Sequence, residues 1–269
     1  MKTYRKFFVL PFIYGIIFSW HCYFRYTNAP SVGDVLSEFD GGYWSNARGE
    51  GLISNYISLF VPFFMFVFVF STYIYRHFCN SSVYVFSRCE NRYKWFLKES
   101  AKLFIYTAIN TLTVLIGFFI MGLVTGRLRY STGDINILLW YYFMYTLWAY
   151  QIVLMANIIA FYKGSTIGVA ISMAIQLMMG LFLSVLPEKN FSQMDTLKAK
   201  LCPLAYLGAS WYENPRFLPE IFRKTGSEPV AVLAVSSGFI IMTLFVLVTL
   251  VAGMIAVEKV DIIESDKEV

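Results

Sequence analysis

Charged side chains are scarce in this chain. Asp, Glu, Lys and Arg make up 14% of its 269 residues, whereas hydrophobic residues make up 58%, and the mean hydropathy is +0.58. Soluble domains are typically about 25% charged and roughly 45–50% apolar. The composition therefore excludes an ordinary soluble protein and predicts an integral membrane protein. The net charge of +5 does not indicate nucleic-acid binding, because no basic soluble domain is available to carry that function.

Cysteine and histidine are also few. Cys22, Cys79, Cys89 and Cys202 lie far apart, without Cys-x-x-Cys pairs or neighbouring histidine ligands, so we interpret them as structural thiols rather than as disulfides or metal ligands. The apolar segments hold no cluster of Asp, Glu or His of the kind that an intramembrane protease or a metal-dependent lipid enzyme requires. We therefore predict no catalytic site, metal or cofactor on this chain.

Long apolar runs dominate what remains. Six segments reach the length of about 20 residues that a helix needs to cross about 30 Å of hydrocarbon. The first is longer than a signal-peptide core and no small-residue cleavage site follows it, so we interpret it as a retained helix. The chain is thus expected to be all-α, one transmembrane domain over 1–269. The predicted spans are approximately 7–24, 53–75, 101–124, 136–161, 165–186 and 230–256.

Lys and Arg are distributed unequally between the two sides of these spans. With the N-terminus inside, ten flank the inner ends and only four lie in the opposite short loops. Because positively charged loops stay on the cytoplasmic side, both termini, the loop 76–100 and the turn 161–165 are predicted to be cytoplasmic, in a multi-pass protein of the cytoplasmic membrane. The predicted outer segments are 25–52, 125–135 and 187–229.

Ionisable side chains hardly occur within the predicted spans, which argues against a transporter driven by an ion gradient. Four amides do occur there, and each needs a partner inside the bundle. Interhelical hydrogen bonds are the plain interpretation, and a polar substrate passage is the alternative. Pro62 is expected to kink span two. The phenylalanine rings of that span either face lipid or line an apolar path. The candidate substrate-path residues are Phe60, Phe64, Asn110, Gln151, Asn157 and Gln176.

Two further patterns concern packing. Gly122-x-x-x-Gly126 and Gly164-x-x-x-Gly168 have the spacing that lets helix backbones approach closely, although such pairs are too common to identify a dimer interface. Before the last span, 197–212 is apolar but too short and too interrupted to cross a membrane. We predict a re-entrant outer hairpin there.

The most informative segment is 76–102, which carries six Lys or Arg against two acids. The Asn-Ser-Ser at 80–82 offers helix N-cap candidates and predicts a short helix over about 81–90. A second helical piece runs from Asn91 toward span three, with basic groups that can meet anionic headgroups. The plain interpretation is a pair of interfacial helices that anchor the loop to the membrane.

The order of these features resembles the type 2 exporter class of ATP-binding-cassette (ABC) transporter permeases. In that family the loop between spans two and three often ends in apolar residues, Ser-Arg, a second Arg, an aromatic residue and a Lys. This chain follows that order and is similar to bacterial peptide- or bacteriocin-related members. It departs from many members at the start of the loop, where Arg76 and His77 replace an acid. The matching residues are Val83, Tyr84, Val85, Phe86, Ser87, Arg88, Arg92, Trp95 and Lys98.

The resemblance implies that the helix 81–90 is a coupling helix, seated in a groove of a cytoplasmic ABC ATPase subunit. ATP and Mg²⁺ would bind that subunit, because this chain has no Gly-x-x-x-x-Gly-Lys-Ser/Thr phosphate loop. A second permease, identical or related, would complete the pore. The residues implied to contact the ATPase are Ser82, Val83, Tyr84, Phe86, Arg88, Glu90 and Arg92.

The leading hypothesis is therefore the permease subunit of an ATP-driven ABC exporter for an amphipathic substrate, such as a peptide or a lipid-like compound. The phenylalanine-rich spans and the missing charges are the basis for that substrate class. The alternative is a non-transporting membrane protein, an immunity or sensory subunit that binds a peptide or a signalling partner. A membrane enzyme is disfavoured because no catalytic cluster is evident.

Overall fold

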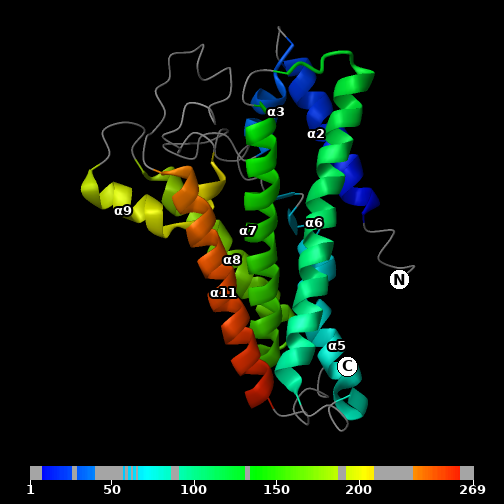
Figure 1. Ribbon diagram of the computed structural model, residues 1–269, viewed down its shortest axis with the longest axis vertical. Helices are drawn as coiled ribbons and strands as arrows, with labels where there is room; N and C mark the ends of the chain where they lie inside the picture. The colour runs from blue at the N-terminus through cyan, green and yellow to red at the C-terminus, as the bar shows by residue number, and fades with distance from the viewer. Residues whose placement is uncertain are drawn as a thin grey trace.

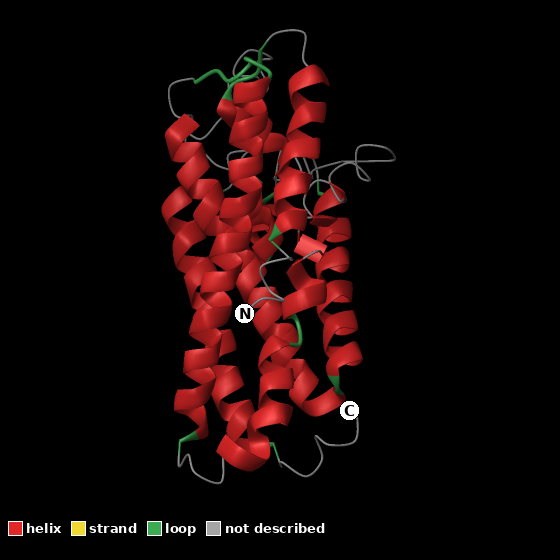
Figure 2. Cartoon of the chain, turned by 90° about the vertical axis from the view of Figure 1, so that its right-hand side faces the viewer, coloured by secondary structure: helices red, strands yellow, loops and turns green. Residues whose placement is uncertain are grey.

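The helices of this protein form an elongated bundle (Figure 1; Figure 2). Within the described residues the secondary structure is helical, apart from an isolated β-bridge between Ser31 and Arg129. The prediction of an all-α protein is therefore confirmed for this part of the chain. The computed structural model describes residues 8–25, 29–39, 57, 60–61, 63–64, 66–85, 91–130, 134–186, 192–208 and 233–260.

Four of the described helices are long and apolar enough to cross a membrane: α6 (Arg92–Val124), α7 (Asp134–Lys163), α8 (Ser165–Ser184) and α11 (Val235–Lys259). They correspond to predicted spans three to six, and they support a membrane-embedded protein. The first predicted span forms α2 (Val9–Arg25), which is apolar but has only 17 residues. The second lies partly outside the described residues, as does Pro62 with its expected kink. The six-span topology therefore stays a prediction.

Helix α6 is much longer than a membrane is thick. Its 33 residues correspond to about 50 Å, against about 30 Å of hydrocarbon. All of its charged side chains lie in the first three turns, whereas 103–124 contains no Asp, Glu, Lys or Arg. The uncharged part is long enough to cross the membrane alone. With that part crossing the membrane, the first three turns would extend beyond the hydrocarbon. They join the helical piece predicted from Asn91 to span three without a break.

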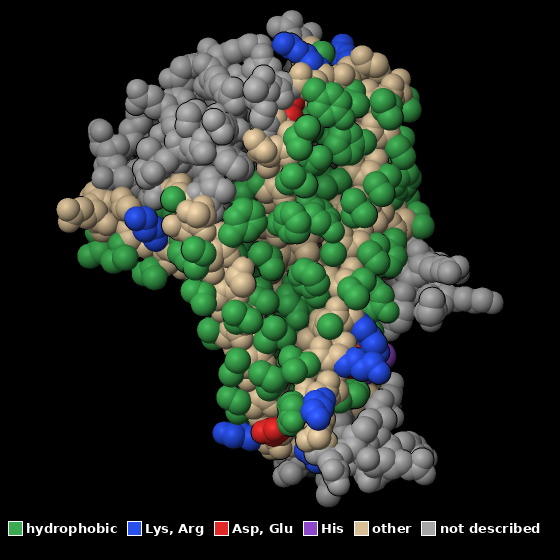
Figure 3. Space-filling view, in the orientation of Figure 1, with side chains coloured by type: hydrophobic (Ala, Val, Ile, Leu, Met, Phe, Trp, Pro, Cys, Tyr) green, Lys and Arg blue, Asp and Glu red, His purple; other side chains and the backbone are tan. Residues whose placement is uncertain are grey.

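The two ends of the bundle are built from different elements. At one end lie α5 (Tyr73–Val85) and the start of α6 (Figure 1), where Arg92 Nη1 donates to the backbone oxygen of Val260 just beyond α11 at 3.2 Å. We call this the α5–α6 end, and Lys and Arg side chains gather there in Figure 3. At the other end α3 (Val32–Phe39) meets the α6–α7 connection, where Val32 N donates to Arg129 O at 3.0 Å. Which side of the membrane each end faces stays a prediction.

The crossing of α2 and α6 is a close one and involves two glycines, one on each helix. A Cβ added to Gly117 would lie 2.5 Å from the backbone oxygen of Phe12, and one added to Gly15 would meet the backbone oxygen of Val114. Neither position has room for a side chain. The sequence pattern missed this pair, because its two members come from different helices rather than from one small-x-x-x-small motif.

The two predicted glycine motifs each contribute one packing glycine. A Cβ on Gly122 would lie 2.5 Å from the hydroxyl of Tyr23, and one on Gly168 would lie 2.6 Å from a backbone oxygen of α7. The second glycine of the first motif, Gly126, has φ 63°, and the first of the other, Gly164, has φ 84°. Both glycines therefore adopt a backbone conformation that L-residues rarely adopt. Close approach of helix backbones is therefore confirmed at Gly168, whereas Gly122 makes room for the side chain of Tyr23.

The segment before α11 forms a short helix followed by a 3₁₀ turn. Helix α9 (Gln193–Leu201) projects from the side of the bundle (Figure 1), and it begins with a capping box in which Ser192 Oγ accepts from Asp195 N at 3.1 Å. The 3₁₀ helix η1 (Pro203–Leu207) is fully buried. The described part of the predicted hairpin is therefore non-spanning, as expected, with α9 at the surface and η1 inside.

Candidate functional site

The α5–α6 end begins with a break in the helix that leads into α5. Residues 66–70 are helical, Ser71 and Thr72 form a turn, and α5 then starts at Tyr73. A break of this kind leaves backbone N–H groups at the start of the new helix and carbonyl groups at the end of the old one without their helical partners. In a buried location those groups need partners from elsewhere.

Asn157 of α7 supplies those partners. Its side-chain oxygen accepts from the backbone N–H groups of Ile74 at 2.8 Å and Tyr75 at 3.2 Å. Its amide nitrogen donates to the backbone oxygens of Phe70 at 3.1 Å and Val153 at 2.8 Å. Two donors and two acceptor positions are all that an asparagine amide has, and Asn157 is completely buried. One side chain therefore fixes both sides of the break to α7.

The predicted helix start at 80–82 is wrong. These residues lie inside α5, which runs without interruption from Tyr73 to Val85. The sequence pattern located Ser and Asn side chains that favour N-caps, but the cap is Asn157, from a distant part of the chain. A local motif cannot reveal a cap of that kind.

A buried carboxylate joins α5 to α6 close to this break. Glu99 is 4% exposed, and its carboxylate accepts from the hydroxyl of Tyr73 at 3.0 Å and from Lys102 Nζ at 2.6 Å. His77 Nδ1 lies 3.5 Å from the same carboxylate. Hydrogen bonds to an ionised group are roughly twice as strong as neutral ones. Glu99 therefore links two residues of α5 with one of α6, and we call these four residues the Glu99 cluster.

Aromatic rings complete the attachment of α5. Phe78 is fully buried, and its ring centroid lies 5.1 Å from that of Phe161 on α7 and 6.1 Å from that of Trp95 on α6. Tyr75 also contacts Phe161, at 6.2 Å. Rings at these separations pack favourably. Helix α5 is thus fixed to both α6 and α7 by hydrogen bonds and by ring packing.

The residues predicted to contact an ATPase surround this structure. Ser82, Val83 and Tyr84 lie in the last turns of α5. Arg92 is the first residue of α6 and bonds the chain beyond α11. The structure thus places the two flanks of the predicted contact at the same end of the bundle. The remaining predicted contacts, Phe86, Arg88 and Glu90, lie outside the described residues.

Three of the predicted substrate-path residues meet around Trp148 of α7. The ring of Phe60 lies 5.8 Å from Trp148, and Phe64 stacks on Phe60 at 5.7 Å. Trp148 Nε1 donates to Gln176 Oε1 at 3.2 Å. Phe60, Trp148 and Gln176 are buried, so this group is a packed contact between spans that the Trp148–Gln176 hydrogen bond joins.

The other three candidates lie elsewhere. Asn157 has its hydrogen-bonding positions occupied at the α5 break, Asn110 is buried on α6, and Gln151 is half-buried on α7. None of the six lines the pocket of about 600 Å³ that the structure contains between α8 and α9. A substrate path through these residues stays a prediction.

Comparison with known proteins identifies no relative, because no protein-family model, curated protein or solved structure matches this chain. Within the described ranges no three His, Cys, Asp or Glu residues come together as a metal site, and Cys22, Cys79 and Cys202 are not joined by disulfides. The α5–α6 end is therefore the candidate functional site on the strength of its geometry.

The Glu99 cluster is not evident from the sequence alone, where Glu99 and Lys102 contribute only to the charge count of the loop. Their spacing of three residues, and the spacing of four between Tyr73 and His77, place each pair on one face of a helix. That signal was present, but only the fold brings the two pairs together.

Proposed function

We propose that this chain is the transmembrane permease subunit of an ATP-driven ABC exporter, and that its α5–α6 end receives a cytoplasmic ATPase subunit. The observation that carries the proposal is the attachment of α5. This helix continues to Val85, into the predicted ATPase-contacting residues, while Asn157 and the Glu99 cluster fix its base to α7 and α6. A helix fixed in this way transmits a displacement of its tip to the spans.

The surroundings of α5 support the same proposal. The first three turns of α6 extend beyond the hydrocarbon, and Lys94 and Lys98 are exposed there. Together with α5 they present a helical, basic surface to water. Membrane anchoring alone requires only an amphipathic face and basic side chains, whereas α5 is also fixed at its base to two spans through buried polar groups.

The remaining parts of the proposal follow from the family resemblance. ATP and Mg²⁺ bind the partner ATPase, and a second permease, identical or related, completes the pore. The protein lies in the cytoplasmic membrane with the α5–α6 end inside. The substrate is amphipathic, such as a peptide or a lipid-like compound. The alternative function is an immunity or sensory subunit that binds a peptide without transporting it.

Reconstitution with the ATPase encoded beside this chain tests the proposal. The wild-type chain should bind that ATPase and stimulate ATP hydrolysis in proteoliposomes. Combined substitution of Tyr84, Phe86 and Arg88 by alanine should leave expression intact and uncouple hydrolysis from transport. Tyr130→Ala, an exposed aromatic at the opposite end, is the matched control and should behave as wild type.

Each outcome decides between the candidates. A purified chain that neither binds nor stimulates a neighbouring ATPase contradicts the exporter proposal. If such a chain binds a peptide encoded nearby, the immunity or sensory function is favoured instead. Coupling that survives the triple substitution means that the ATPase contacts another surface.

A further inference from the structure

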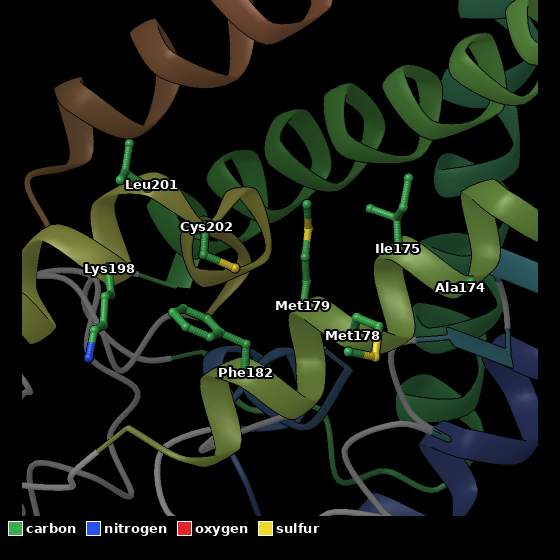
Figure 4. A pocket seen from close by; sticks show the side chains of 8 residues that line it. All are labelled: Ala174, Ile175, Met178, Met179, Phe182, Lys198, Leu201 and Cys202. Carbon is green, nitrogen blue, oxygen red and sulfur yellow. The ribbon is translucent and has the colours of Figure 1, made fainter.

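A pocket of about 600 Å³ lies between α8 and α9, far along the chain from the α5–α6 end. This volume is within the roughly 300–1,000 Å³ typical of small-molecule sites. Its walls come from the second half of α8 and the last turn of α9, and Figure 4 shows Phe182 and Met179 of α8 directed toward α9. The lining residues are Ala174, Ile175, Met178, Met179, Phe182, Lys198, Leu201 and Cys202.

The chemistry of this lining is apolar with one cation. Burial raises the pKa of the Cys202 thiol, which therefore stays neutral at physiological pH. Lys198 is the only charged side chain of the lining. Its Nζ lies 3.5 Å from Asp195 Oδ1, and its side chain remains 45% exposed. Asp195 uses its other oxygen, Oδ2, to accept from the Ser192 hydroxyl at 2.6 Å. The exposed part of the lysine is the part that can meet a second anion.

The setting of the pocket indicates lipid around it. Helix α9 projects sideways from the bundle (Figure 1), and its exposed Met194, Leu197 and Leu201 recur at helical spacing. In Figure 3 hydrophobic side chains line the underside of this arm, next to a basic group. A helix with an apolar stripe and lysines, set across the spans, has the features of an interfacial helix. Beneath it, only 28% of the most apolar stretch of α8 is buried within the protein.

We propose that the pocket between α8 and α9 binds an anionic phospholipid, with one acyl chain against Met178, Met179 and Phe182 and the phosphate at Lys198. The acyl chain matches the apolar walls, which are continuous with the surface of a membrane-spanning helix. The phosphate matches the single cation, which α9 holds at the level of the headgroups. This site goes beyond the exporter function and does not depend on it.

Native mass spectrometry of the full chain in detergent tests this site. Phosphatidylglycerol and phosphatidylcholine with identical acyl chains are the probes. The wild type should prefer phosphatidylglycerol, and Lys198→Gln should weaken that preference by about five-fold, as expected for one basic side chain near a lipid phosphate. Lys200→Gln removes the same charge from α9 at a residue that does not line the pocket. It should leave the preference unchanged.

Filling the pocket provides a second measurement. Ala174→Trp should weaken binding of both lipids, whereas Ala170→Trp, at an exposed position one turn earlier on α8 and outside the lining, should not. Equal effects of the two lysine substitutions would mean general surface attraction and would overturn the site, as would unchanged binding in Ala174→Trp. If Ala174→Trp instead separates an oligomer, a second copy occupies the pocket. None of these results involves an ATPase, so they leave the exporter proposal to its own test.

Discussion

Replacing Asn157 with leucine should lower the free energy of unfolding by about 2–3 kcal/mol. The substitution leaves the N–H groups of Ile74 and Tyr75 buried without an acceptor, and each lost hydrogen bond contributes about 1–1.5 kcal/mol. The bond to Val153 adds little, because that carbonyl already accepts a helical bond within α7. The bond to the Phe70 oxygen, at the end of the interrupted helix, is lost as well, so the two N–H groups at the start of α5 set the lower limit of the cost.

Gln176→Leu is the matched control. It also replaces a buried amide in a predicted span with leucine, but this amide accepts one hydrogen bond, from Trp148. Single hydrogen bonds between membrane helices average about 0.6 kcal/mol and reach about 1.7. The control should therefore cost about 0.6 kcal/mol, which is at least about 1 kcal/mol less than Asn157→Leu.

Unfolding in mixed micelles with increasing SDS measures both costs, and hydrogen exchange locates them. In Asn157→Leu the amides of Ile74 and Tyr75 should exchange faster. The relative exchange rates of the amides in the middle of α6 should stay as in the wild type. Equal stabilities of the two variants, within about 0.5 kcal/mol, would refute the assignment of Asn157 as the cap of α5. Unchanged exchange at Ile74 and Tyr75 would refute it independently.

Three other predictions use related measurements. Glu99→Leu should lower the free energy of unfolding by about 2 kcal/mol, whereas Lys102→Gln should cost under about 1 because that lysine is 42% exposed; equal costs would contradict a central carboxylate. Gly15→Ala should lower the free energy of unfolding by about 1–3 kcal/mol through overpacking, and Gly126→Ala should lower it by about 1 kcal/mol because its φ is positive. A smaller cost for Gly15→Ala than for Gly126→Ala, in the same assay, would contradict the close crossing of α2 and α6. The hydrogen bond from the Ser192 hydroxyl lowers the pKa of Asp195. The contribution of the Asp195 carboxylate to capping α9 is therefore present at neutral pH and is lost as the pH falls below the usual aspartate value of 3.8. At that acidic pH the α9 amides, corrected for intrinsic rates, should exchange faster in the wild type and not in Asp195→Asn.

The sequence predicted the parts of this fold that depend on composition and length. Spans three to six are visible as long, predominantly apolar runs, and α7 and α8 differ from the predicted limits by at most two residues at any end. Their ends carry polar residues or glycine, such as Lys163 and Gly164, which interrupt the apolar pattern. The short and interrupted apolar stretch 197–212 likewise predicts a non-spanning segment before α11.

The candidate site was less predictable because its contacts join distant parts of the chain. Asn157 is separated from Ile74 by 83 residues, and no periodicity reports such a pair. The amides were expected to pair between helices or to line a passage, and Asn157 does the former with backbone atoms at a helix break. The cluster around Glu99 shows the same limit, since spacing within each helix was readable but the meeting of the two helices was not.

The continuity of α6 has a mechanical consequence. A single rod of about 50 Å connects Arg92 at one end of the bundle with Val124 near the other. If it pivots near one end, a tilt of only about 5° moves the opposite end by about 4 Å. Such a lever arm needs no internal hinge, so a small rotation at one end of α6 becomes a displacement of several ångströms at the other end.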